Sequence, residues 1–347
     1  MRRIVVVDTM GGLGDLLLAV PVIEAVCRSH PEARVTVVTT APWHVLLERD
    51  PRIHEVVPVP GKAAADVDAA VRPVLERLRP DLAITTNRQH GLPGLLERTA
   101  VRAVTDLWRS PPADEPVDLR MLRLLAADGV IDPDLAAIPP RIVLDEDERG
   151  TGRRALAGLA AGRPALLMPD SGMRVKQWPL AEWAGSTASL LRDGWQPIVV
   201  SQVAEQRAAL ESAGAVVAPE LPLRALAALF AAAAERDGRA VGGDTGPVRL
   251  ASAAGLAVVG LFGPTAAGRY GYRGGRATNL QGYPDCPVRT PTAITEQECW
   301  WTARCPLSET SEPRCMADIG VEAICLPSRM TVTVSHTAAT SSSLCEI

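Results

Sequence analysis

The chain has 347 residues, of which 47% are hydrophobic and 22% charged, and its net charge is −4 at pH 7. Because single hydrophobic cores stop growing at roughly 250–300 residues, this length indicates two domains of ordinary globular composition. The slight acidity, with Lys and Arg scattered, argues against a polybasic surface for nucleic acid or membrane, and no apolar run reaches the roughly 18 residues of a membrane span.

The N-terminal half alternates between short apolar strands and helices. The first strand is predicted at 4–7, an apolar run shorter than the about 7–15 residues of a signal peptide, so we expect a cytoplasmic protein. Further strands are predicted at 34–39, 55–59 and 81–86, and helices from the turn at 11–15 to residue 29, at 44–49 and at 66–78. Pro21 predicts either a kink in the first helix or its regular start there. Strands that are apolar nearly throughout are typical of a parallel sheet covered on both faces.

The pattern weakens between residues 138 and 162 and then restarts. Two prolines, a charged run at 145–149 and two glycines indicate a linker with one connecting helix. Beyond it, strands are predicted at 165–168, 197–201, 216–218, 240–242 and 257–262, and helices at 180–192, 204–212, 223–234 and 247–254. The sequence therefore predicts two Rossmann-like α/β domains, residues 1–150 and 151–325, with a ligand cleft between them. The tail at 326–347 shows no periodicity, and we expect it to be disordered.

A small-residue turn between a strand and a helix is the sharpest local feature. It follows Gly242 and continues with Asp244, Thr245 and Gly246, and Pro247 stands in the first turn of the helix. The N–H groups of such a turn and the helix dipole form a site for a phosphate. The alternative is that Asp244 and Thr245 only cap the helix.

The loop at 169–179 also follows a strand, at the edge where open α/β sheets bind ligands. It supplies the hydroxyl of Ser171 and the cations Arg174 and Lys176. Taken alone, the segment is better interpreted as a surface loop with solvated cations.

The turn after the first strand contains Gly12, Gly14 and Asp15. It is a poor dinucleotide fingerprint because Leu17 occupies the third glycine position, and the turn has no Walker lysine. What remains is a carboxylate on a glycine-rich turn, which is either a functional group or a helix cap.

These three features occur in the order and spacing of a known family. The sequence resembles glycosyltransferase family 9, the ADP-heptose:lipopolysaccharide heptosyltransferases. The resemblance rests on a G-D-x-L turn followed by a helix with Pro, on K-x-W-P at 176–179, and on a D-[ST]-G stretch from Asp244 that continues to L-F-G-P-T at 261–265. It extends from residue 1 to about 320.

The resemblance implies a GT-B architecture, with the acceptor in the N-terminal half and the nucleotide sugar in the C-terminal half. It implies an inverting transferase that needs no metal, moving a heptose or related sugar, ADP-heptose foremost, to an acceptor hydroxyl. Asp15 would be the general base, and Gly12 and Gly14 would form the acceptor-side turn. Lys176 would stabilise the leaving diphosphate. The donor is further expected to contact Ser171, Glu205, Asp244, Thr245, Gly246 and Arg249.

Arg249 departs from the family pattern, which usually has His at this place. Arginine is permanently cationic and cannot accept a proton, although its forked donors can still serve a phosphate. A nucleotide-sugar-binding protein of the same fold with weak or no turnover is therefore the alternative, and the retained Asp15 and Lys176 argue against it.

A cluster of cysteines lies near the end of the second domain, at Cys286, Cys299, Cys305 and Cys315. The spacing lacks the paired C-x2–4-C typical of zinc ribbons. The cluster is either reduced thiols in a loop or a structural zinc or iron–sulfur site, and no cofactor is expected in catalysis.

The expected partners are a nucleotide-diphosphate sugar and a glycan, glycolipid or small natural-product acceptor, without nucleic acid or an integral membrane segment. The location is expected to be cytoplasmic or peripheral to the inner face of the membrane. Because acceptors vary within the family, the identity of the acceptor stays open. The sequence also leaves open the sugar and the nucleotide base of the donor and the oligomeric state.

Overall fold

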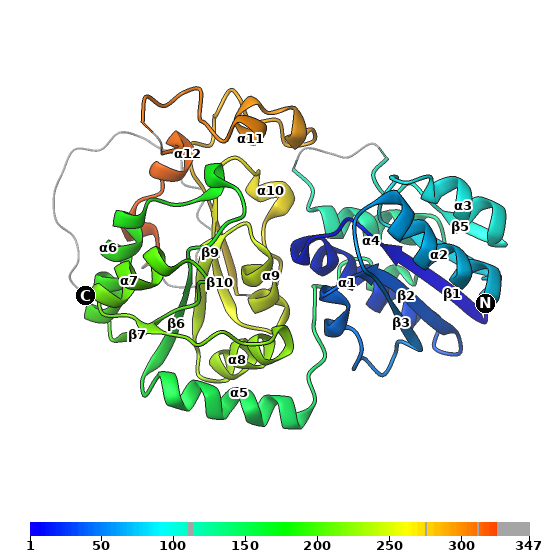
Figure 1. Cartoon of the computed structure of the whole chain (residues 1–347), viewed down its shortest axis with the longest axis horizontal. Helices are drawn as coiled ribbons and strands as arrows, with labels where there is room; N and C mark the ends of the chain where they lie inside the picture. The colour runs from blue at the N-terminus through cyan, green and yellow to red at the C-terminus, as the bar shows by residue number, and fades with distance from the viewer. Residues whose placement is uncertain (110–113, 275, 311, 325–347) are drawn as a thin grey trace.

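The computed structural model describes residues 1–109, 114–274, 276–310 and 312–324. The predicted disordered tail at 326–347 lies outside them. Within this part of the chain, no helix is both long and apolar enough to cross a lipid bilayer. The described residues form two α/β lobes that lie side by side, the first coloured blue to cyan and the second green to orange (Figure 1).

The first lobe is built on a five-stranded parallel sheet of order β3-β2-β1-β4-β5. Its strands are β1 (Arg3–Asp8), β2 (Arg34–Thr40), β3 (Glu55–Val59), β4 (Leu82–Thr85) and β5 (Arg102–Val104). Its helices are α1 (Leu13–Ser29), α2 (Ala64–Leu78), α3 (Leu92–Thr99) and α4 (Val117–Ala127), with a 3-10 turn η1 (Trp43–Leu46) where a longer helix was predicted and a second, η2 (Pro133–Leu135). Residues 4–7 of β1 are fully buried, as a parallel strand covered on both faces requires.

Four elements of this lobe were not predicted, namely α3, β5, α4 and the short turn η2. Helix α1 runs through Pro21 over 17 residues, so the regular helix begins at Leu13 and not at the proline.

The second lobe has a six-stranded parallel sheet of order β11-β10-β9-β6-β7-β8. Its strands are β6 (Arg163–Met168), β7 (Trp195–Val199), β8 (Val216–Val217), β9 (Arg239–Gly243), β10 (Ala257–Phe262) and β11 (Ala277–Gln281). Its longer helices are α5 (Glu146–Leu159), α6 (Leu180–Arg192), α7 (Ala204–Ser212), α8 (Leu223–Glu235) and α9 (Gly246–Ala253). The second lobe also contains short helical elements: η3 (Arg174–Lys176), α10 (Ala267–Tyr270), η4 (Ile294–Glu296), α11 (Glu298–Thr302), α12 (Arg314–Ala317) and η5 (Val321–Ile324). The two parallel sheets confirm the predicted α/β fold class.

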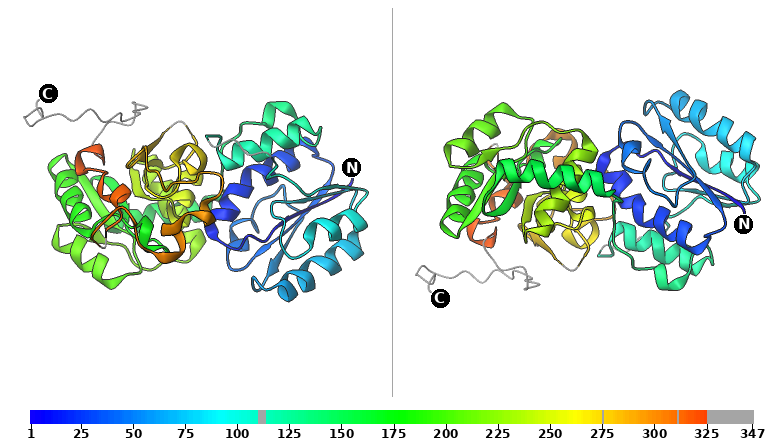
Figure 2. Two further views of the ribbon diagram at one scale, coloured as in Figure 1. Left: turned by 90° about the horizontal axis from the view of Figure 1, so that it is seen from above. Right: turned by 90° about the horizontal axis from the view of Figure 1, so that it is seen from below.

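Helix α5 connects the lobes and packs along α8 on the underside of the second one (Figure 2). It starts at a capping box, in which the side chain of Asp145 accepts a hydrogen bond from the Glu148 amide at 2.9 Å and the Glu148 side chain reciprocates at 3.0 Å. A Cβ at Gly152 would lie 2.1 Å from the Ala228 carbonyl oxygen, so only glycine permits this close packing. The expected domain boundary at residue 150 falls inside this helix.

The contact between the lobes is made by α1 and α9, which face each other between the sheets (Figure 1). A Cβ on Gly246 at the start of α9 would lie 2.8 Å from Cβ of Leu13 at the start of α1. A second contact between the lobes is made by Arg224 of α8, which donates to the carbonyls of Val45 and Leu46 in the first lobe and also to Glu148 of α5. The two glycine-rich turns are therefore brought into direct contact.

Candidate active site

A cavity of about 960 Å³ lies between the lobes and is lined by residues of both. In each sheet it opens at the carboxyl ends of the strands where the strand order reverses, after β1 and β4 in the first sheet and after β6 and β9 in the second. These are the switch points at which open α/β sheets bind ligands. The fold therefore places the three predicted turns around one space.

Asp15 lies in the first turn of α1 and lines this cavity. Its Oδ2 accepts a hydrogen bond from the Gly12 amide at 3.1 Å, which fixes the carboxylate against its own turn. Burial raises the pKa of Asp15, while the Gly12 amide and the charges of Arg249 and Lys62 act in the opposite direction. A carboxylate with a raised pKa is a stronger base and is better suited to take a proton from a hydroxyl.

Asp8 is a second carboxylate at the cavity, at the end of β1, and the sequence reasoning did not single it out. It is 2% exposed and accepts a hydrogen bond from Thr86 Oγ1 at 2.5 Å. Burial raises its pKa to about 6, and the charge of Asp15 adds to the effect. Asp8 ends the first apolar strand, and a carboxylate at that position is the sequence feature that could have identified it as a site residue.

The opposite wall is the turn that starts α9. Thr245 is its N-cap in extended backbone, but its side chain does not cap the helix. Among the described residues, Thr245 Oγ1 is buried without a hydrogen-bond partner. The Thr245 amide meets the Tyr272 hydroxyl at 3.4 Å, and that hydroxyl donates to the Gly243 carbonyl at 2.6 Å. A buried free hydroxyl at a helix N-terminus can bind an anion.

Lys176 follows β6 and reaches the same turn. Its ammonium donates to the Asp244 carbonyl at 2.7 Å, lies 3.8 Å from Oδ2 of that residue, and sits 5.7 Å from the centre of the Trp300 ring. Its side chain is 16% exposed. A half-enclosed cation beside a helix N-terminus is a suitable site for a diphosphate.

Arg249 is buried in α9 and ion-paired with Asp244, with Nη2 and Oδ1 2.6 Å apart. Nη2 also donates to the Tyr270 carbonyl. Burial by itself would raise the pKa of Asp244, but the positive charges of Arg249 and Lys176 hold that pKa below its ordinary value. A Cβ at Gly14 would lie 3.7 Å from Cδ of Arg249, so this arginine spans the contact between the lobes.

The structure brings nearly all the predicted site residues together. The cavity is lined by Gly12, Gly14, Asp15, Ser171, Lys176, Asp244, Thr245, Gly246 and Arg249. Glu205 does not line it, because it stands exposed in the first turn of α7; Glu220 and Ser201 lie at that end instead. The sequence reasoning also missed Trp43 and Trp108, which come from irregular or 3-10 segments without a periodic pattern.

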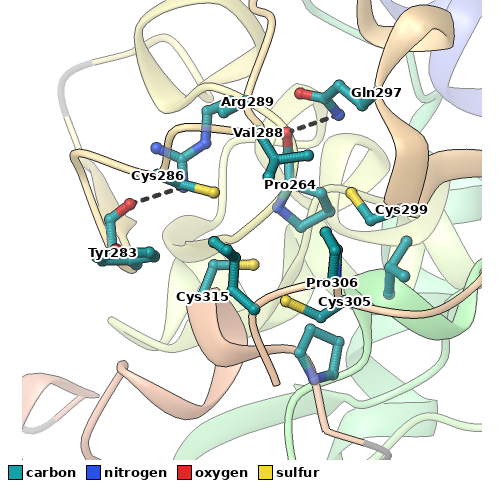
Figure 3. Close-up of a pocket in the computed structure, with 13 residues that line it drawn as sticks. Pro264, Tyr283, Cys286, Val288, Arg289, Gln297, Cys299, Cys305, Pro306 and Cys315 are labelled. Atoms are coloured by element: carbon teal, nitrogen blue, oxygen red, sulfur yellow. Dashed lines mark hydrogen bonds between the residues drawn. The ribbon is translucent and has the colours of Figure 1, made fainter. Parts of the chain in front are cut away.

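The four cysteines Cys286, Cys299, Cys305 and Cys315 are distant in sequence but line one small cavity of about 20 Å³ (Figure 3). Around them, Arg289 donates to the Tyr283 carbonyl and Gln297 to that of Pro264. All four are free thiols. Burial raises the pKa of Cys315 to about 12 and also raises that of Cys299, so both are protonated near neutral pH.

These thiols are not arranged as metal ligands. Across the part of the chain that the structure describes, no group of three or more His, Cys, Asp and Glu side chains is placed to hold a metal ion. The segment does reach the large cavity, since Ile294 and Trp300 line its wall. The cluster is therefore a convergence of thiols next to the candidate active site, and a bound metal stays a prediction.

The pattern described as "Glycosyltransferase family 9 (heptosyltransferase)" matches residues 85–289. No curated protein sequence is significantly similar to the chain.

Several solved structures resemble the chain in fold. A family 9 glycosyltransferase from Veillonella parvula superposes with a TM-score of 0.73 at 17% identity, over 93% of this chain and 95% of that one. The heptosyltransferase WaaC of E. coli, solved with ADP, gives 0.62 at 17% identity, over 85% and 98%. The iron-containing dodecameric glycosyltransferase TibC of enterotoxigenic E. coli gives 0.56 at 15% identity, over 93% and 74%. At such identities the likeness shows the shared two-sheet fold.

Proposed function

The chain belongs to glycosyltransferase family 9, the heptosyltransferases, and from that premise we propose that it moves a heptose or related sugar from a nucleotide-diphosphate donor to an acceptor hydroxyl. ADP-heptose is the foremost donor, since WaaC was solved with ADP. The observation that carries the proposal is a single cavity with a carboxylate of raised pKa on one wall and a cation beside a helix N-terminus on the other.

The reaction we propose is a single displacement. The acceptor oxygen attacks the anomeric carbon as the bond from that carbon to the diphosphate oxygen breaks, and Asp15 takes the hydroxyl proton. Attack from the face opposite the leaving group inverts the anomeric centre. Asp15 suits the role because it lines the first-lobe wall of the cavity and burial strengthens it as a base.

The leaving diphosphate would bind at the α9 turn. Lys176, the amides of Thr245 and Gly246, and the free hydroxyl of Thr245 offer donors there. Donors aimed at the charge that develops on the leaving group stabilise the transition state more than the ground state. Arg249 neutralises Asp244 beside this site and so keeps its carboxylate from repelling the diphosphate.

The test of the proposed function is release of free nucleotide in the presence of an acceptor, compared among ADP-, UDP- and dTDP-linked sugars. We expect acceptor-dependent release that is fastest with an ADP-linked donor. The alternative of a nucleotide-sugar-binding protein without turnover predicts tight donor binding and no release with any acceptor.

Transfer is expected to survive brief exposure to EDTA. Lys176 and the N-terminus of α9 supply the charge that a divalent ion would otherwise provide at the diphosphate. The measurement is initial rate with and without chelator. Immediate loss of activity, restored by magnesium or manganese, would point to a metal-dependent transferase.

For the cysteine cluster two alternatives stay open, reduced thiols in a loop or a structural zinc or iron–sulfur centre, and the second requires the thiols to rearrange and lose their protons. TibC, a protein of the same fold, contains iron. Prolonged treatment with a strong chelator is expected to lower the thermal midpoint before it lowers the rate of the folded enzyme. Elemental analysis of the purified chain is the check: metal near one equivalent per chain supports the site, and a metal-free, fully stable protein removes it.

A cytoplasmic location and peripheral contact with the inner face of the membrane stay predictions.

A further inference from the structure

The second-lobe wall of the large cavity carries cations together with the acidic residues Asp170, Glu220 and Asp244, whereas the first-lobe wall carries acidic residues and no cation among those described. The basic side chains that line the cavity, Lys176 and Arg249, both come from the second lobe. On the wall of the first lobe, the charged residues among those described are Asp8 and Asp15.

A cation of the first lobe that acts on this wall is Lys62, in the loop between β3 and α2. A Cβ at Gly11 would lie 2.5 Å from Cε of Lys62, so its stem covers the outside of the turn. Lys62 is exposed and does not line the cavity, and its charge acts on Asp15. An anionic group on the acceptor would therefore face two carboxylates of this wall. The cations near them are otherwise engaged or outside the lining: Arg249 is paired with Asp244, and Arg269 lies 5.8 Å from the centre of the Trp108 ring without lining the cavity.

Two indoles stand on the same wall and are held in place by hydrogen bonds. Trp43 Nε1 donates to the Gly11 carbonyl at 3.3 Å, and Trp108 Nε1 donates to the Thr86 carbonyl at 2.5 Å. Both line the cavity. The face of an indole carries negative potential and attracts the polarised C–H groups on the apolar side of a sugar ring.

We propose that the acceptor is a sugar without any anionic group, bound with its ring against Trp43 and Trp108 and its reacting hydroxyl toward Asp15. This inference rests on the proposed function and specifies the substrate class of the acceptor side. The carboxylates accept hydrogen bonds from sugar hydroxyls, and the indoles supply apolar surface. A phosphorylated or uronic acceptor is disfavoured because the charged side chains of this wall, Asp8 and Asp15, are both carboxylates.

The test uses a panel of methyl pyranosides of several stereochemistries, each with its 6-phosphate and its uronic acid counterpart. Acceptor KM is measured from nucleotide release with the full chain. Neutral members are expected to have a KM at least tenfold below that of their anionic counterparts, with little dependence on salt. An anionic member that is preferred, with a KM that rises as salt screens an attraction, overturns the proposal. So does a panel in which no neutral sugar is accepted.

A charge placed on this wall gives a second, independent readout. Met10 lines the cavity and is 37% exposed, so a long polar side chain is tolerated there. Met10→Arg is expected to lower the KM of anionic acceptors at least fivefold, and the uncharged control Met10→Gln is not. Equal effects of the two variants contradict the charge argument.

The indoles are tested by Trp108→Ala with Trp108→Phe as its control. Trp108→Ala should raise the acceptor KM about tenfold at unchanged nucleotide affinity, and Trp108→Phe should largely retain the KM. An unchanged acceptor KM removes Trp108 from the subsite. Nucleotide binding separates this outcome from the proposed function: if no nucleotide binds, the transferase itself is in doubt, whereas normal binding with anionic preference overturns only the acceptor class.

Discussion

Asp15→Asn is expected to lower turnover roughly 10²–10⁴-fold, the contribution typical of a general base. The carboxamide keeps the size of the side chain and can still accept the Gly12 amide, but it cannot take the acceptor proton. Donor affinity should stay nearly unchanged, because the proposed diphosphate site lies in the other lobe. The measurements are initial rate by nucleotide release and nucleotide Kd by calorimetry.

The control is Asp145→Asn, since Asp145, the N-cap residue of α5, also accepts a backbone amide at the start of a helix but does not line the cavity. It should cost some stability and leave turnover intact. An Asp15→Asn enzyme with more than about a tenth of wild-type turnover would contradict the assignment.

The pH profile gives a further check on Asp15. A base works only when deprotonated, so activity should be full above its pKa and fall as the pH drops through it. Because burial raises the pKa of Asp15, this acidic limb should lie at a higher pH than for a free aspartate. In Asp15→Asn the residual rate should lose that limb.

Lys176→Ala is the second variant with a large expected effect, and here binding and chemistry should fall together. A hydrogen bond to a charged group contributes about 1.5–3 kcal/mol, so nucleotide Kd should rise roughly 10- to 100-fold. In the proposed site the cation would contact phosphate in the ground state and still more in the transition state, so kcat should also fall, by about 10²–10³-fold. Calorimetry with the nucleotide and steady-state kinetics separate the two losses.

The only other lysine of the chain, Lys62, provides the control. Lys62 lies in the first lobe, away from the proposed diphosphate site in the second, so Lys62→Ala should leave nucleotide Kd unchanged. Because Lys176 also holds the Asp244 carbonyl, circular dichroism and the thermal midpoint are needed to show that Lys176→Ala is folded. Unchanged nucleotide affinity in a folded Lys176→Ala protein would remove this lysine from the donor site.

The sequence by itself determined the two parallel sheets, because their central strands are continuous apolar runs followed by turn residues. β1 and β10 are examples: every residue from 4 to 7 and from 257 to 262 is buried. It also located the turns at Gly12, Lys176 and Thr245, since glycine, capping residues and cations after a strand have a local signature. Edge elements escaped it: β5 has three residues, and β11 is a half-buried A-T-N-L-Q run without a clear period.

Only the tertiary structure decided which side chains meet. The packing of α1 on α9 sets the turn of Asp15 against that of Gly246, and no local pattern encodes that contact. The same packing sets Arg249 against Gly14 of the first lobe, and the fold of the second lobe leaves Glu205 outside the cavity. Short-range periodicity fixes helices and strands, whereas a site between two lobes depends on contacts between residues more than 200 positions apart, which follow from the docking of whole surfaces.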